Sequence, residues 1–321
     1  MHFGCFGPVT PWPARALAPL LAPLLALLLA LLLVACQTPP PAPPPPLLPE
    51  APPVMVAPPK PAQRLPRIGL ALGGGAARGF AHIGVIQVLE EAGIRPDLVA
   101  GTSAGSLVAA LYASGKTGAE MAVLAMAMDE GAITDWAFPS RGLIRGEALA
   151  RYVREQTGGR TIEQMKLPLG IVATHLDSGA AVLFQRGDTG AAVRASSAVP
   201  AVFQPVKIGP AEYVDGGLVS PVPVRFARQM GAELVLAVDI SSPPDGNSTS
   251  DVMKMLLQTF AIMGRSINQF ELRDADVVLR PVLTGVASAD FGARQKAILA
   301  GREAALRQLP ELRARIATLT R

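Results

Sequence analysis

Two stretches decide the fold: RIGLALGGGAARGFAHIGVIQVLEEAG at 67–93 and LVAGTSAGSLVAALYASG at 98–115. Each passes from a short apolar run through a glycine-containing turn into a longer segment with helical apolar spacing. Residues 67–72 and 98–100 are too short for buried helices and stop at glycine, which predicts buried strands. The segments 80–92 and 104–114 are each followed by glycine, the usual helix stop, which predicts helices.

The same alternation continues along the chain and predicts the fold class. We expect further strands at 169–173, 181–184, 233–238 and 276–279. We expect further helices near 119–129, 146–156, 189–197, 222–230, 251–272, 290–305 and 310–319. Strands that alternate with helices are typical of an α/β layered domain with a mainly parallel central sheet. We assign this domain to residues 67–321.

Composition separates the N-terminal segment from the rest of the chain. The protein has 321 residues, 17% of them charged, and a formal net charge of +4. Fourteen of the 31 prolines lie within residues 39–66. Beyond residue 66 the composition is that of a globular domain long enough to bury one large core. Because Lys and Arg are scattered and form no long basic run, we expect no nucleic-acid partner.

Residues 16–35 are almost wholly apolar and end in Leu-Val-Ala directly before Cys36. This pattern resembles a bacterial lipoprotein signal, which implies that residues 1–35 are removed and that Cys36 carries lipid. A signal anchor that keeps its helix is the alternative. The resemblance implies a lipid-anchored protein of the bacterial cell envelope, and Gln37 favours the outer membrane, facing the periplasm. Residues 36–66 would then be a lipidated cysteine and a Pro-rich tether, extended as polyproline II or disordered.

The cysteines limit the other chemistry of the chain. Cys5 lies in the segment that would be removed, and Cys36 is the only other cysteine. The mature chain could therefore form no internal disulfide and no cysteine-based metal site.

Residues 101–105, Gly-Thr-Ser-Ala-Gly, have the G-x-S-x-G pattern between a predicted strand and a predicted helix. In that context the pattern indicates a nucleophile elbow, a sharp turn that exposes the Ser103 hydroxyl at a helix N-terminus. The alternative is an ordinary tight turn in which Ser103 caps the helix.

The loop at 73–79, GGGAARG, ends the first strand and opens the first helix. Glycine backbones there can point N–H groups at an anion, either a phosphate or the oxyanion of an acyl-transfer intermediate. A dinucleotide site would need an acidic residue at the end of the second strand, where Gly101-Thr102-Ser103 stands instead. A P-loop is excluded because the glycine loop is not directly followed by Gly-Lys-Ser/Thr.

A serine nucleophile needs a base, and the histidines are poorly placed to serve as one. His82 follows the glycine loop on a predicted helix, and His175 follows a strand without an acid in the expected order. Asp215 ends a short strand and opens a Gly-Gly turn, which favours a carboxylate base that acts directly on Ser103. An ordinary Asp-Gly turn is the alternative for Asp215, and a chemical role of His175 stays open.

Four blocks occur in order: the glycine loop with Arg78-Gly79, the elbow at 101–105, ASSAVP at 195–200, and Asp215-Gly216-Gly217. Together they resemble the patatin-like phospholipase family. The resemblance implies a three-layer α/β/α domain and a Ser-Asp dyad, with Ser103 as nucleophile and Asp215 as general base.

The resemblance also assigns the oxyanion hole to the glycine loop: Gly74, Gly75, Ala76 and Arg78. Ala76 stands where many relatives carry glycine, which restricts its φ angle. The implied function is hydrolysis of acyl esters of (phospho)lipids at a membrane surface, with no cofactor and no metal, and the sequence names no protein partner. The alternatives are a lipoprotein that binds lipid or a partner without turnover, and a histidine-dependent esterase.

Three further features of the sequence have alternative explanations. Segments 119–128 and 252–263 are rich in Met and Leu, so they either pack as core helices or line an acyl-chain pocket or a membrane-facing lip. Four arginines, at 265, 273, 280 and 294, either meet phospholipid headgroups or are solvated. Arg78 either assists an anionic headgroup or forms a structural ion pair.

Overall fold

The computed structural model describes residues 64–129, 131, 134–137, 141–244 and 249–321. The chain divides into two units, Met1–Lys60 and Pro61–Arg321, and the fold below belongs to the second. The expected signal sequence, Cys36 and the tether up to residue 63 lie outside the described residues. Within the described ranges, none of the helices is long and apolar enough to cross a membrane.

A sheet of eight strands forms the centre of the second unit, in the order β10-β9-β1-β2-β4-β8-β7 with β5 also paired to β4. From β10 to β4 all neighbours are parallel, whereas β5, β8 and β7 pair antiparallel. β3 and β6 pair separately. The strands are β1 (Ile68–Leu72), β2 (Leu98–Thr102), β3 (Gly142–Ile144), β4 (Leu169–His175), β5 (Ala181–Phe184), β6 (Ala201–Phe203), β7 (Val206–Ile208), β8 (Ala211–Asp215), β9 (Leu234–Val238) and β10 (Val277–Leu279).

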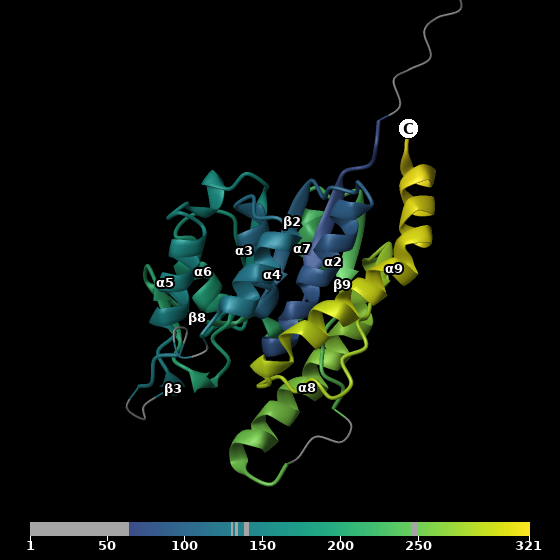
Figure 1. Ribbon diagram of the computed structural model, residues 1–321. Coiled ribbons are helices and arrows are strands. Elements are labelled where there is room, and N and C mark those ends of the chain that lie inside the picture. Colours follow the sequence, from purple (N-terminus) through teal and green to yellow (C-terminus); the bar gives the residue numbers. More distant parts are fainter. Residues whose placement is uncertain (1–63, 130, 132–133, 138–140, 245–248) are drawn as a thin grey trace, which may run out of the picture. The chain divides into compact units, whose positions relative to one another are not determined.

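Helices cover both faces of this sheet, so the domain has three layers (Figure 1). Because side chains alternate along a strand, Leu70 and Leu72 face α2, α3, α4 and α9, while Ala71 faces α7. The α-helices are α2 (Phe80–Glu91), α3 (Ala104–Ala113), α4 (Gly118–Ala127), α5 (Glu147–Gln156), α6 (Thr189–Ser196), α7 (Val224–Gln229), α8 (Val252–Glu271) and α9 (Arg294–Leu319). The 3-10 helices are η1 (Ala76–Gly79), η3 (Ile162–Gln164), η4 (Gly216–Leu218), η5 (Leu272–Asp274) and η6 (Phe291–Ala293). The predicted fold class is confirmed.

Strand β4 brings two distant segments of the chain together. β5 occupies one edge of β4 along residues 171–174. On the other edge, Thr102 at the end of β2 pairs with Val172, and Asp215 at the end of β8 pairs with Ala173. Since β2 and β8 run in opposite directions, their carboxyl ends meet at consecutive residues of β4.

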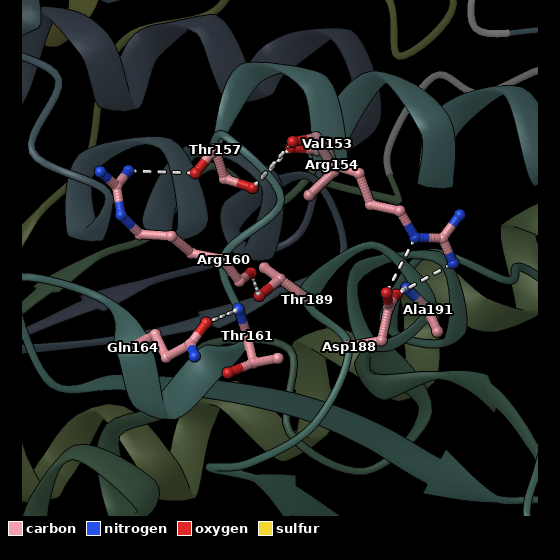
Figure 2. A network of polar contacts seen from close by, with 9 residues as sticks. All are labelled: Val153, Arg154, Thr157, Arg160, Thr161, Gln164, Asp188, Thr189 and Ala191. Atoms are coloured by element: carbon pink, nitrogen blue, oxygen red, sulfur yellow. Dashed lines mark hydrogen bonds and ion pairs between the residues drawn. The ribbon is translucent and has the colours of Figure 1, made fainter.

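A network of polar contacts fixes the start of α6 (Figure 2). Asp188 caps this helix by accepting the Ala191 N–H at 2.5 Å, and it also forms an ion pair of 2.8 Å with Arg154 of α5. The Thr189 hydroxyl donates to the carbonyl of Arg160 at 2.8 Å. The helix is only eight residues long, so this anchoring fixes the position of its last residue, Ser196.

The predicted elements are present, with ends within two residues of the observed ones, apart from two differences. Strands β3, β6 and β7 were not predicted, because three residues are too few to show a period and depend on their pairing partners. The helices predicted at 290–305 and 310–319 form one helix, α9, which continues through Pro310. Pro310 has no N–H to donate to the carbonyl of Leu306. Because Leu306 is exposed, water can form a hydrogen bond with this carbonyl.

Candidate active site

Ser103 lies in a strained turn between β2 and α3. Its φ is +53° and its ψ is −126°, a backbone conformation that L-residues rarely adopt. The flanking glycines explain how the turn closes. A Cβ on Gly101 would lie 2.5 Å from the carbonyl oxygen of Gly105, and one on Gly105 would lie 2.1 Å from that of Leu72. The G-x-S-x-G spacing is therefore required by the approach of α3 to the sheet.

The Ser103 hydroxyl donates to Oδ2 of Asp215 at 2.7 Å. The other carboxyl oxygen accepts the N–H of Gly217, also at 2.7 Å, so the turn after β8 fixes the side chain. Burial raises the pKa of Asp215 to about 6, while the hydrogen bonds from Gly217 and Ser103 oppose the rise. A carboxylate with a pKa near 6 is a stronger base than an exposed aspartate and is still ionised at neutral pH.

Ser196, at the end of α6, forms a hydrogen bond with the backbone of the elbow. Its hydroxyl oxygen accepts the N–H of Ser103 at 2.8 Å, and its O–H donates to the carbonyl of Val172 at 2.5 Å. The side chain is fully buried. The block 195–200 supported the family resemblance, but its sequence gave no sign of this positioning role.

Gly75 and Ala76 of the glycine loop line the same cavity as Ser103. The cavity, of about 240 Å³, is lined by Gly75, Ala76, Ser103 and Asp215 among others. Within the described part of the chain, the N–H groups of Gly75 and Ala76 have no hydrogen-bond acceptor. Ala76 adopts φ +50°, so alanine occupies the left-handed conformation that glycine would adopt with less strain.

The two other residues assigned to the oxyanion hole are placed differently from the sequence prediction. Gly74 contacts the elbow, but its N–H donates to the carbonyl of Pro221 at 2.9 Å. The N–H of Arg78 donates to the carbonyl of Gly75 at 3.1 Å, because Arg78 lies within the turn of η1. Its side chain is buried, and burial lowers its pKa while the charge of Asp239 opposes this. Neither N–H is available to an oxyanion.

The two histidines in the described part of the chain, His82 and His175, do not contact the Ser103 hydroxyl. His82 is fully buried and its Nε2 lies 2.8 Å from the carbonyl of Gly73, which helps to fix the glycine loop. Burial lowers its pKa to about 4, so its ring is neutral at pH 7. The Nδ1 of His175 lies 3.0 Å from the hydroxyl of Ser178, and its ring stands edge-on to Tyr213. Of the candidate bases, Asp215 is the one hydrogen-bonded to Ser103.

The Met-rich segments have different surroundings. In α4, Met121 and Ala125 are buried in the core, as the core-helix interpretation expects. In α8, by contrast, none of the residues 252–267 is buried, so the core interpretation is wrong there. Instead Leu257, Phe260 and Ala261 line the Ser103 cavity. Among the described residues, no cluster of His, Cys, Asp and Glu could hold a metal ion.

Comparisons with known proteins place this fold and site in a family. Residues 70–228 match the family model described as patatin-like phospholipase, and this match includes both Ser103 and Asp215. The chain is 39% identical over 184 residues to an uncharacterized NTE family protein of Mycobacterium tuberculosis. It is 34% identical over 184 residues to patatin-like phospholipase domain-containing protein 6 of Mus musculus. Residues 70–228 of the chain therefore form a patatin-like phospholipase domain.

The matches differ in how much of each protein they cover. The Mycobacterium match covers 56% of this chain and 51% of the relative, so the chain spans about half the length of that relative. The mouse match covers 54% of this chain and 14% of that protein. Among solved structures, VipD from Legionella pneumophila aligns with a TM-score of 0.52 and 15% identity, over 76% of this chain and 67% of that one. This last likeness concerns the fold alone.

The pKa of Asp215 predicts how Ser103 reactivity depends on pH. The carboxyl must be ionised to accept the hydroxyl proton, so reactivity should be present above pH 6 and lost as the pH falls through about 6. The measurement is the rate at which a fluorophosphonate probe labels Ser103 between pH 4.5 and 8.5, with Ser103→Ala as the blank. A rate independent of pH, or a midpoint that disappears in His175→Ala, would contradict Asp215 as the base.

Proposed function

We propose that this protein is a serine esterase that hydrolyses acyl esters of membrane lipids through Ser103 and Asp215. The observation that carries the proposal is the 2.7 Å hydrogen bond from the Ser103 hydroxyl to a buried carboxylate at a nucleophile elbow. The N–H groups of Gly75 and Ala76 border the same cavity, where an oxyanion would form. The match of residues 70–228 to the patatin-like phospholipase family model supports the same reaction class.

The geometry supports a two-step reaction. Asp215 takes the hydroxyl proton as the Ser103 oxygen attacks the ester carbonyl carbon, and the N–H groups of Gly75 and Ala76 stabilise the resulting oxyanion. Collapse of this intermediate breaks the ester C–O bond, and the leaving alcohol takes the proton from Asp215. Water then attacks the acyl-serine and gives its proton to Asp215. The fatty acid leaves as the Ser103 oxygen regains that proton.

The surface of α8 supports a lipid as the substrate. Val252, Met255, Ile262 and Met263 are large apolar residues exposed on this helix, at fractions from 47% to 87%. The same helix lines the Ser103 cavity with Leu257, Phe260 and Ala261. A helix that is apolar toward both solvent and the cavity suits a contact with the acyl region of a membrane, from which a lipid would enter the cavity.

The proposal extends to the location of the enzyme. Lipid attached to Cys36 and an extended segment up to residue 66 would hold the domain at the periplasmic face of the bacterial outer membrane. At about 3.1 Å per residue such a tether reaches roughly 90 Å, so the anchor would leave the domain free to turn α8 toward the bilayer.

Removal of either dyad member should abolish ester hydrolysis. Ser103→Ala lacks the nucleophile and Asp215→Asn lacks the base, so each should lower kcat/KM for p-nitrophenyl butyrate by about a thousandfold or more. His175→Ala is the control and should keep full activity. Circular dichroism checks that the variants are folded. Full activity in Ser103→Ala would contradict the proposal, and a folded but inactive wild type would favour lipid binding without turnover.

A charged side chain on the exposed face of α8 should weaken binding to membranes without affecting hydrolysis of a soluble ester. Ile262→Asp is expected to lower binding to phospholipid vesicles about tenfold, because an exposed apolar side chain that would enter the membrane is replaced by a carboxylate. Hydrolysis of p-nitrophenyl butyrate, a soluble ester, should persist. The matched control is Val123→Asp on α4, where the residue is 69% exposed. Equal vesicle binding by wild type and both variants would exclude α8 as the membrane contact.

The anchor is tested by Cys36→Ser in the full-length protein. We expect this variant to lose incorporation of radiolabelled palmitate and to move from the membrane to the soluble periplasmic fraction. Unchanged labelling and fractionation would refute lipidation at Cys36. A wild-type protein that fractionates with the inner membrane would refute only the outer-membrane location.

A further inference from the structure

A second cavity adjoins the one that contains Ser103. Its volume is about 560 Å³. The two cavities share Ser241, Ser242 and Arg265 in their linings, so a single molecule can extend from one into the other. The proposed reaction uses no residue that is unique to the second cavity.

The lining of the second cavity is cationic. Arg265 of α8, Arg273 of η5 and Arg280 after β10 supply three guanidinium groups from three elements. Asp239 is the one carboxylate among the lining residues, and it lies 3.4 Å from Arg280. The lining therefore carries more positive than negative charge, which favours an anionic ligand.

Asn268 adds a buried polar group that lacks a partner. Its side chain is 4% exposed and lines the second cavity. The amide nitrogen donates to the hydroxyl of Ser241 at 2.9 Å, but the amide oxygen is buried without a hydrogen-bond donor in the described part of the protein. Such an unsatisfied acceptor is costly, and a ligand hydroxyl or ammonium group would satisfy it.

One face of α8 links the two cavities. Residues spaced three or four apart share a helix face, and Leu257, Ala261, Gly264, Asn268 and Leu272 follow this spacing. Toward the N-terminus this face is apolar and lines the Ser103 cavity. Toward the C-terminus it carries Arg265 and Asn268 and lines the second cavity. The change from apolar to cationic lining matches the change from acyl chain to headgroup in a phospholipid.

We propose that the second cavity binds the phosphate of a glycerophospholipid headgroup, with Arg273 and Arg280 as donors, while an acyl ester of the same molecule lies at Ser103. The inference rests on the proposed esterase function and adds to it a separate subsite for the headgroup phosphate. Guanidinium groups bind phosphate oxygens with charge-assisted and often paired hydrogen bonds, which explains the choice of arginine. Asn268 would accept a hydrogen bond from the headgroup beyond the phosphate.

The test compares two short-chain substrates that differ only in the headgroup. Dihexanoylphosphatidylglycerol and dihexanoylglycerol carry the same acyl chains, and both are used as dissolved monomers, so that membrane docking plays no part. Arg273→Gln is the main variant, because this side chain packs over the Phe270 ring, 5.1 Å from its centroid, and forms no ion pair within the described part of the chain. Arg315→Gln, an exposed position on α9, is the matched control.

The expected result is a change in preference between the two substrates. Arg273→Gln should lower the ratio of kcat/KM for the phospholipid over the diacylglycerol about tenfold, mainly through KM, with partial recovery in Arg273→Lys. Arg315→Gln should keep the wild-type ratio. Inorganic phosphate should compete with the phospholipid in wild type and less so in Arg273→Gln.

Three outcomes would overturn the inference in distinguishable ways. An unchanged ratio of kcat/KM in Arg273→Gln would show that the second cavity does not bind the headgroup phosphate. Competition by inorganic phosphate without any wild-type preference for the phospholipid would make the cavity a site for free phosphate. No hydrolysis of either substrate or of p-nitrophenyl butyrate by folded wild type would mean that the proposed esterase function itself had failed.

Discussion

The site depends on one constraint, the pairing of β4 with the ends of two strands that approach from opposite directions. Val172 pairs with Thr102 and Ala173 pairs with Asp215. The residue after β2 and the last residue of β8 therefore come within hydrogen-bond distance. The carbonyl of Val172 also accepts the hydroxyl of Ser196, which holds the Ser103 N–H. A shift of one residue in the pairing of either β2 or β8 with β4 would change the spacing between Ser103 and Asp215.

This arrangement combines several locally unfavourable features. Ser103 and Ala76 both have positive φ, and Asp215 is buried, which by itself favours its neutral form. Each feature persists because surrounding contacts determine it: the packing of α3, the turn at Gly217 and the anchoring of α6 by Asp188. Strain and an elevated carboxyl pKa are typical of sites where a nucleophile is held ready by a nearby base.

Helix α8 joins the elbow at its C-terminal end to an exposed apolar surface at its other end. Glu271, at its last turn, accepts the hydroxyl of Ser220, and the carbonyl of Ser220 accepts the hydroxyl of Thr102, directly before the nucleophile. The C-terminal end of α8 is therefore fixed to the elbow, whereas residues 252–267 contribute no buried side chain. An enzyme acting on lipids needs both properties, because its substrate lies in another phase while its reacting atoms must be placed accurately.

The sequence by itself determined the order of the longer strands and helices and pointed to Ser103 and Asp215 as candidate site residues, because apolar spacing and glycine positions are local signals. It did not reveal that the N–H of Gly74 is bonded to Pro221, that Ser196 supports the elbow, or that Pro310 lies within a helix. The sequence also did not reveal the surroundings of α8, since Met and Leu suit both a core and a membrane surface. Only the tertiary structure decided these points, because each depends on partners far away in the chain.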